Sequence, residues 1–340
     1  MNDLITVIIP VYNVENYVAE TIKSVLIQSY SNIEILLIND GSTDKSLEII
    51  NQIAKEDDRI KVIDKINEGL SSARELGVRH AHGKYFVTID SDDILDQDYI
   101  KEMHEAIVQY NADIALCARK TFDASGNQEV LLLSNVERYI CIDKKMLDKG
   151  YNYIAGDYQM SDSWNKMYRT AYVLSTDVHF IMPKQYNGTD LLFNYCLLMH
   201  CPKIVTVNRP LYFYRLTEKS RVRRKNKHLE VGFKYILDRL LEEKNIIGGS
   251  EELEDQIYAA YFSMIKYATQ DLTEEIQKMS YSQRISEYDK ILITLPLTKR
   301  KTRILHATRK ELKFFVILLL MRSAKGIDAY YTLRSYRRNK

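Results

Sequence analysis

The stretch YFVTIDSDD, residues 85–93, sets the fold class of this chain. A short apolar run is followed at once by three carboxylates in four positions, Asp90, Asp92 and Asp93. Carboxylates this close repel one another, and burying them is costly unless a cation or strong hydrogen-bond donors compensate. Two interpretations follow. The stretch is either a site where a hard divalent cation meets phosphate oxygens, or an Asp-rich turn that caps the next helix.

The residues before this stretch alternate between β-branched runs and helical patterns. Runs at 5–9, 33–38 and 60–63 predict strands, and apolar residues at helical spacing predict a helix after each of them. The last of these helices is expected over 70–81, with Gly83 in the C′ position that glycine favours. This order, with its short connections, predicts an α/β fold with a parallel, doubly wound sheet.

Polar side chains follow the strands of the predicted sheet. In doubly wound sheets, ligands bind outside the carboxyl ends of the strands. Those ends carry Tyr12 and Asn13, Asp40, Asn67, and the aspartates that begin at Asp90. The sequence has no GxGxxG after the first strand and no GxxxxGK[ST], so neither a dinucleotide dehydrogenase nor a P-loop enzyme is indicated. An anionic nucleotide is expected to be held through a metal at the aspartates.

Length and composition limit the remaining possibilities. The 340 residues suit one large domain with an appendage, or two domains. Four cysteines form no CxxC pair and are typical of reduced thiols in the cytosol. The apolar run Phe314–Met321 has eight residues, whereas a membrane-spanning helix needs about 20.

The charge is distributed unevenly. The net charge is +2, but the residues from Lys299 onward hold thirteen Lys or Arg against two acidic residues. A basic tail on an acidic body predicts an anionic partner surface, which is either nucleic acid or membrane.

Four motifs, in order and in register, resemble those of family 2 glycosyltransferases. They are VIIPVYN at 7–13, NDGSTD at 39–44, NEGLSSAR at 67–74 and DSDD at 90–93. The resemblance covers residues 4–96 closely and continues more weakly to about residue 220. It implies a GT-A fold, in which a mostly parallel central sheet is flanked by helices. The expected domains are a GT-A domain at 1–220, with a nucleotide-binding half at 1–118 and an acceptor half at 119–220, and a helical region with the basic tail at 221–340.

The resemblance also implies roles for residues at the donor side. Asp40 would bind the uracil ring, Asp90 the ribose, and Asp92 a Mn²⁺ or Mg²⁺ ion that bridges the diphosphate. The other residues implied at the nucleotide are Pro10, Tyr12, Glu15, Asn67 and Arg74. Asp93 is expected either to support the metal-binding turn or to cap the next helix. Glu75 stands where the family often has Asn, and we expect it to face outward.

The acceptor side rests on two further segments. SWNKMYR at 163–169 resembles a W-x-K-x-[YF] segment, in which Trp164 and Lys166 would shape the donor-sugar and acceptor pocket; the alternative is a core tryptophan beside a solvated lysine. YNGTDLLF at 186–193 stands where the family has Glu-Asp, so Asp190 would be the general base and Thr189 replaces the Glu. The alternative for Asp190 is a helix cap. Arg221 and Arg223 are candidates for the diphosphate, or belong to a solvated basic loop.

The implied activity is that of an inverting glycosyltransferase of bacterial polysaccharide synthesis. It would move a hexosyl or N-acetylhexosaminyl group from a nucleotide sugar, with UDP expected, to a hydroxyl of a glycan or lipid-linked acceptor. A catalytically silent relative, acting as a nucleotide-sugar-binding or partner subunit, is the alternative, because Thr189 departs from the pattern. Nucleic-acid binding would explain the basic tail but not the carboxylates, and no RNP motif is present.

The expected location is cytoplasmic, at the inner face of the cell membrane. An interfacial helix at Phe314–Met321 could bury its apolar side chains while the basic residues meet anionic lipid. The alternative is an ordinary core helix with a solvated basic face.

Overall fold

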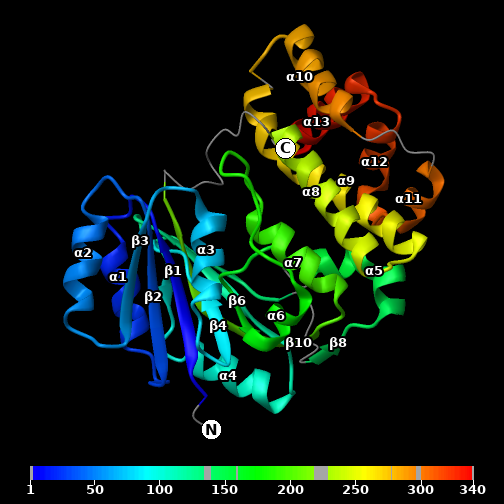
Figure 1. Cartoon of the computed structure of the whole chain (residues 1–340). Helices are drawn as coiled ribbons and strands as arrows, with labels where there is room; N and C mark the ends of the chain where they lie inside the picture. The colour runs from blue at the N-terminus through cyan, green and yellow to red at the C-terminus, as the bar shows by residue number, and fades with distance from the viewer. Residues whose placement is uncertain are drawn as a thin grey trace. The chain divides into compact units, whose positions relative to one another are not determined.

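A computed structural model of the chain describes residues 3–133, 139–157, 160–217, 229–276, 278–295 and 300–338. The chain divides into two compact units (Figure 1). The first comprises Met1–Asp143 and Asp157–Asn226, and the second Lys144–Gly156 and Lys227–Lys340.

The first unit is built on one sheet with the strand order β3-β2-β1-β4-β9-β6-β10-β5, where β7 pairs with β6 and β8 with β10. Its strands are β1 (Ile5–Val11), β2 (Ile33–Asp40), β3 (Ile60–Lys65), β4 (Tyr85–Thr88), β5 (Ile94–Leu95), β6 (Ile114–Asp123), β7 (Gln128–Leu131), β8 (Tyr139–Cys141), β9 (Lys166–Arg169) and β10 (Lys203–Leu216). The pairs β1–β2, β1–β4, β2–β3 and β6–β10 are parallel. The prediction of a mostly parallel sheet is confirmed. The antiparallel strand β9, which lies between β4 and β6, was not predicted.

Helices of the first unit flank this sheet (Figure 1). They are α1 (Val18–Leu26), α2 (Ser46–Ala54), α3 (Leu70–Arg79), α4 (Tyr99–Gln109), α6 (Thr170–Thr176) and α7 (Thr189–Met199). Every residue of β1 and β2 is buried, as expected for β-branched strands covered on both faces. On α1 the apolar residues at helical spacing, Val18, Ile22 and Val25, are fully buried against this core.

Two glycines let α3 and the start of β4 approach β1 closely. A Cβ on Gly77 of α3 would lie 2.3 Å from the Ile8 Cγ2 atom. A Cβ on Gly83 would lie 2.6 Å from the Thr6 nitrogen. The predicted C′ role of Gly83 is wrong, because α3 ends at Arg79 and His80 occupies the C-cap. Gly83 is needed for close approach and not for a left-handed turn.

The second unit is helical in its described part. It contains α5 (Lys144–Asp157), α8 (Leu229–Ile246), α9 (Glu251–Ile276), α10 (Tyr281–Thr294), α11 (Lys301–Ala307), the 3₁₀ turn η2 (Lys310–Leu312), α12 (Lys313–Leu320) and α13 (Ala324–Arg338). Ile257, Tyr261 and Ile265, which recur every four positions along α9, are all buried.

The domain boundary differs from the expected one at α5. The expected acceptor half at 119–220 includes the residues of α5, but α5 belongs to the second unit. It buries Leu147, Tyr151 and Ile154. Its backbone is also bound by Gln256 of α9, which accepts from the Asn152 N–H and donates to the Lys149 carbonyl. An apolar helical face can pack on any apolar partner, so periodicity alone did not identify α9 as that partner.

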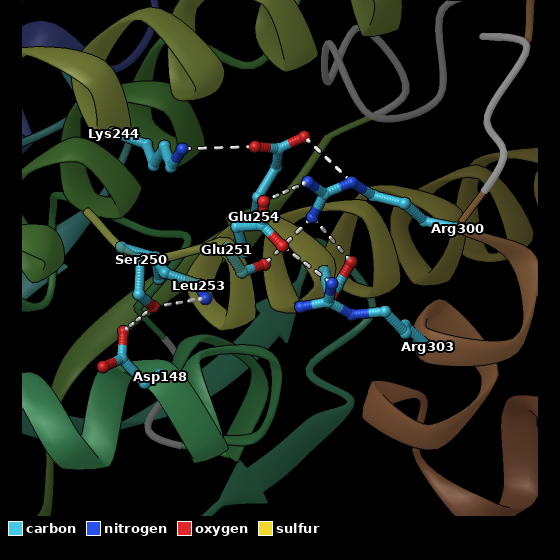
Figure 2. A network of polar contacts seen from close by, with 9 residues as sticks. Asp148, Lys244, Ser250, Glu251, Leu253, Glu254, Arg300 and Arg303 are labelled. Atoms are coloured by element: carbon cyan, nitrogen blue, oxygen red, sulfur yellow. Dashed lines mark hydrogen bonds and ion pairs between the residues drawn. The ribbon is translucent and has the colours of Figure 1, made fainter. Parts of the chain in front are cut away.

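Ion pairs join the acidic start of α9 to the basic residues of α11 and the segment before it (Figure 2). Arg303 pairs with Glu251 at 2.8 Å and with the buried Asp255 at 2.6 Å. Arg300 pairs with Asp255 at 3.3 Å, and Lys244 of α8 pairs with Glu254 at 3.2 Å. Acidic side chains near a helix N-terminus are also favoured by the helix dipole. Arg300 and Arg303 of the basic tail therefore form ion pairs within this unit.

The apolar block Phe314–Met321 lies mostly in α12. Four of its side chains, Phe315, Val316, Leu319 and Leu320, are buried, as the core-helix alternative expected. Phe314 and Met321 are 61% and 68% exposed. Among the described helices, none combines the length and apolarity needed to cross a membrane.

Two glycine-to-alanine changes should have opposite effects on stability. One lies where α3 packs closely on β1, and the other lies in α5. Gly77→Ala should lower the free energy of unfolding of the first unit by about 1–3 kcal/mol, because the added methyl overlaps Ile8 in a packed core. Gly150→Ala should instead stabilise α5 by about 0.5–1 kcal/mol, because its Cβ meets nothing closer than 3.7 Å and alanine favours helices. Denaturant unfolding of both variants checks this. A neutral Gly77→Ala would mean that α3 does not pack on β1 as described.

Candidate functional site

The loop after β1 is tied to the turn after β2. The Asn13 side chain accepts a hydrogen bond from the Thr43 N–H at 2.8 Å, and the Glu15 carboxylate accepts one from the Lys45 N–H at 2.9 Å. Pro10 is buried within β1, whereas Tyr12 is 43% exposed. Of the residues predicted to line the nucleotide pocket from this loop, Tyr12 and Glu15 are therefore exposed, whereas Pro10 is not.

Asp40, at the end of β2, organises the start of α3. Its carboxylate accepts hydrogen bonds from Lys65 Nζ at 2.9 Å and from the N–H groups of Glu68 at 2.9 Å and Gly69 at 2.8 Å. Nearby, the Asn67 Oδ1 atom is buried and has no hydrogen-bond partner among the described residues. The contact of Asp40 with uracil stays a prediction. In this structure its oxygens already hold the turn.

Asp93 anchors the DSDD turn to β10. It is fully buried, and its two oxygens accept hydrogen bonds from the Tyr212 hydroxyl at 2.6 Å and from the Arg215 N–H at 2.8 Å. Burial and the nearby charges of Asp92 and Asp90 raise the pKa of Asp93 well above its usual range. The helix-cap alternative for Asp93 is wrong, because α4 starts at Tyr99 and Asp98 is its N-cap residue.

Asp92 has a partly exposed side chain, and its backbone carbonyl accepts a hydrogen bond from Arg215 Nε at 2.7 Å. The described residues contain no group of three or more His, Cys, Asp or Glu that could enclose a metal. Mg²⁺ is commonly bound through one or two carboxylates and substrate phosphates, and not by a cage of protein ligands. Asp92 fits that mode of binding.

Arg74 of α3 lies between two carboxylates that are far apart in sequence. Its side chain is 1% exposed. One terminal nitrogen donates to Asp90 Oδ1 at 2.6 Å, and the other contacts Asp190 Oδ1. Burial alone would lower the pKa of Arg74, but the charges of Asp190 and Asp90 hold it above its usual value. The structure therefore brings the DSDD motif at 90–93 and the candidate base Asp190 together through one arginine.

Asp190 sits in the first turn of α7. The N-cap position is Gly188, with a φ of 106°, so the helix-cap alternative for Asp190 is wrong. Its Oδ2 accepts a hydrogen bond from the Ser163 N–H at 3.2 Å, and its side chain is 19% exposed. Burial raises the pKa of Asp190, and Arg74 opposes that rise. The preceding Thr189 is buried, and its hydroxyl accepts a hydrogen bond from the Ser71 hydroxyl at 2.7 Å.

Trp164 and Lys166 are both buried. The Trp164 ring lies 4.5 Å from that of Tyr212, with 7% of the residue exposed, which is the core arrangement offered as the alternative. Lys166 is fully buried, so the solvated-lysine interpretation is wrong. Its Nζ donates to Asn165 Oδ1 at 3.0 Å and contacts the Asp162 carbonyl. Burial lowers the pKa of Lys166 to about 8.

Several supporting residues were not predicted from the sequence. Glu75 does not face outward. Its carboxylate accepts from the Phe180 N–H at 3.0 Å and pairs with His179 at 2.9 Å. No role was predicted for Tyr212 and Arg215 of β10, which bind Asp93 and the Asp92 carbonyl, although an aromatic and a cation in a chain with an aspartate cluster were a usable signal. Arg221 and Arg223 lie outside the described residues.

Comparisons with known proteins agree on one family. Residues 6–174 match the model described as Glycosyl transferase family 2. The chain is 33% identical over 231 residues to Glycosyltransferase GlyA of Streptococcus pneumoniae serotype 4, covering 65% of this chain but only 32% of that protein. It is 30% identical over 234 residues to Glycosyltransferase GlyG of the same organism, covering 66% of this chain and 74% of that protein.

A solved structure resembles the whole chain. The crystal structure of S. aureus TarS 1-349 in complex with UDP-GlcNAc superposes with a TM-score of 0.71, covering 99% of this chain and 92% of that one at 18% identity. At this identity the likeness shows a shared fold.

Proposed function

This chain is a glycosyltransferase of family 2 with a GT-A fold, and from that premise we propose that it transfers a sugar, with inversion, from a UDP-sugar to a hydroxyl of a glycan or lipid-linked acceptor. The observation that carries the proposal is the contact of Arg74 with both Asp90 and Asp190. It brings the end of β4, which carries the donor motif, to the start of α7, which carries the candidate base. A sugar donor bound at the end of β4 and an acceptor bound at the start of α7 would therefore lie next to each other.

The donor side supports a nucleoside diphosphate with a divalent cation. Asp92 would hold Mg²⁺ or Mn²⁺, which when bound neutralises charge on the departing diphosphate. Asp93 and Arg215 keep the turn that carries Asp92 in place, through the Arg215 N–H and its Nε atom. TarS has been solved with UDP-GlcNAc, so this donor is the first to test here.

The acceptor side supports base catalysis by Asp190. The carboxylate would take the proton of the acceptor hydroxyl as its oxygen bonds to the anomeric carbon and the bond from that carbon to the diphosphate breaks. A single in-line displacement of this kind inverts the anomeric centre. Asp190 is suited to the task because Arg74 and the Ser163 N–H fix both of its oxygens.

One observation favours the catalytically silent alternative. Thr189, in place of the Glu that the family carries there, turns into the interior and bonds Ser71, so it offers no carboxylate to an acceptor. Turnover of a UDP-sugar separates the two functions, because a silent relative binds the donor without cleaving it.

We expect Asp92→Asn to abolish turnover and the metal-dependent part of UDP binding without unfolding the protein, because the amide lacks the charge that a hard cation needs. The measurements are sugar transfer or slow hydrolysis across a panel of UDP-sugars, and UDP titration calorimetry with and without Mn²⁺. Asp58→Asn, an equivalent change at an exposed position, is the matched control. Full activity in EDTA would refute the metal assignment.

Asp190→Asn separates chemistry from donor binding. Loss of a general base should lower turnover by about 10²–10⁴-fold. The affinity for UDP should barely change, because in this proposal Asp190 serves the acceptor. Steady-state kinetics and UDP titration of the same preparation give both quantities. An equal loss of UDP binding would show that Asp190 is structural.

We also propose that the second unit docks on an anionic membrane surface on the cytoplasmic side. The exposed Phe314 and Met321 of the α12 region lie beside Lys313 and Arg322 in sequence, although most of this apolar block is buried in the unit's own core. Each basic residue at such a surface contributes about 1 kcal/mol, which salt screens.

Vesicle co-sedimentation tests this docking. The full chain should bind vesicles that contain anionic lipid, less so in high salt, and the double change Phe314→Ser with Met321→Ser should weaken binding. Ile66→Ser, which removes an apolar side chain that is 78% exposed in the first unit, is the control. Binding that ignores anionic lipid content, or that both sets of variants retain equally, would argue against docking.

A further inference from the structure

We propose that Arg74 is a positioning residue that couples the two halves of the site. It holds the Asp190 carboxylate ionised and in one orientation, and it makes the protonation of Asp190 depend on the charge of Asp90. The inference rests on the proposed function only in taking Asp190 as the base.

The geometry fixes Asp190 from two directions. Arg74 contacts Oδ1, and the Ser163 N–H donates to Oδ2 at 3.2 Å. Ser163 is itself held, because its hydroxyl accepts from Asn194 Nδ2 at 3.0 Å, and the same nitrogen donates to the Asp190 carbonyl at 2.9 Å. The carboxylate therefore has little freedom to rotate away from Arg74.

Aromatic and acidic residues pack beside this pair, and the Arg74 side chain is only 1% exposed. The Phe180 ring lies 5.9 Å from the Arg74 guanidinium carbon and stacks on Phe193 of α7 at 3.7 Å. Glu75, the residue after Arg74, holds Phe180 through its backbone N–H at 3.0 Å. Charges screened from water interact more strongly, so the field of Arg74 on Asp190 is large.

Stability does not account for this arrangement. A buried arginine between carboxylates gains little over an apolar core of the same volume, since desolvation offsets the attraction. The Arg74 Nε–H is also buried with no hydrogen-bond acceptor among the described residues, which opposes stability. Strongly interacting, buried charges that oppose stability are typical of functional sites.

Several charged groups act on Asp190, and their signs predict the outcome of substitutions. Burial raises the pKa of Asp190, Arg74 lowers it, and Asp90 and then Asp162 raise it. Lys166 and Tyr168 also interact electrostatically with Asp190. Removing the positive charge of Arg74 should therefore raise the pKa of Asp190, and removing the negative charge of Asp90 should lower it.

The experiment is a ¹³C NMR titration of the Asp190 carboxyl in the full chain without substrate, with the resonance assigned by Asp190→Asn. Arg74→Gln should raise the Asp190 pKa by about one to three pH units, which weakens its acidity roughly 10- to 1000-fold. In Arg74→Lys the Asp190 pKa should rise less, because lysine keeps the positive charge. Asp90→Asn should move the pKa in the opposite direction. Arg79→Gln removes an exposed arginine of the same helix and should leave it unchanged.

Two results would overturn the proposal. One is an Asp190 pKa that is the same in wild type and Asp90→Asn, and the other is a shift in Arg79→Gln as large as that in Arg74→Gln. If Arg74→Gln fails to fold, Asp90→Asn still decides the question by the sign of its shift. Because the titration needs no donor or acceptor, a failure of sugar transfer would refute the proposed function without touching this result.

Discussion

The buried contact of one arginine with two carboxylates is the constraint on which the site depends. Arg74 can be buried only while it is paired, since an uncompensated buried charge is prohibitively costly. Asp90 and Asp190 supply the pairs from the end of β4 and the start of α7. The ion pairs thus require the donor strand, α3 and α7 to meet at one place. The helix that carries Arg74, α3, is itself held close to β1 at Gly77.

Around this centre, the aspartates divide by what their oxygens already hold. Asp40 and Asp93 accept backbone N–H and side-chain hydrogen bonds and keep the turns after β3 and β4 in shape. Asp92, on a turn fixed by its neighbour, is partly exposed and suits a cation. Asp190 is also partly exposed, beside a fixed arginine. These aspartates therefore take different roles, which are set by their burial and by the hydrogen-bond donors around each carboxylate.

Much of the fold was predictable from sequence, because β-branched runs and helical spacing report which face of an element is buried. The same patterns do not report the partner. They missed the antiparallel β9, the packing of α5 on α9 in the second unit, and the inward turn of Glu75. The motifs named Asp90, Arg74 and Asp190 separately. Their contact joins residues 116 and 16 positions apart, a relation that no local pattern contains.

The central claim is that donor and base meet at Arg74. A crystal structure of the full chain with UDP-GlcNAc or UDP and Mn²⁺ tests it most directly. We predict the nucleotide at the carboxyl ends of β1, β2 and β4, Mn²⁺ held by Asp92, and Arg74 still in contact with Asp190. A nucleotide bound away from this edge, or Asp190 turned away from Arg74 in the complex, would contradict it.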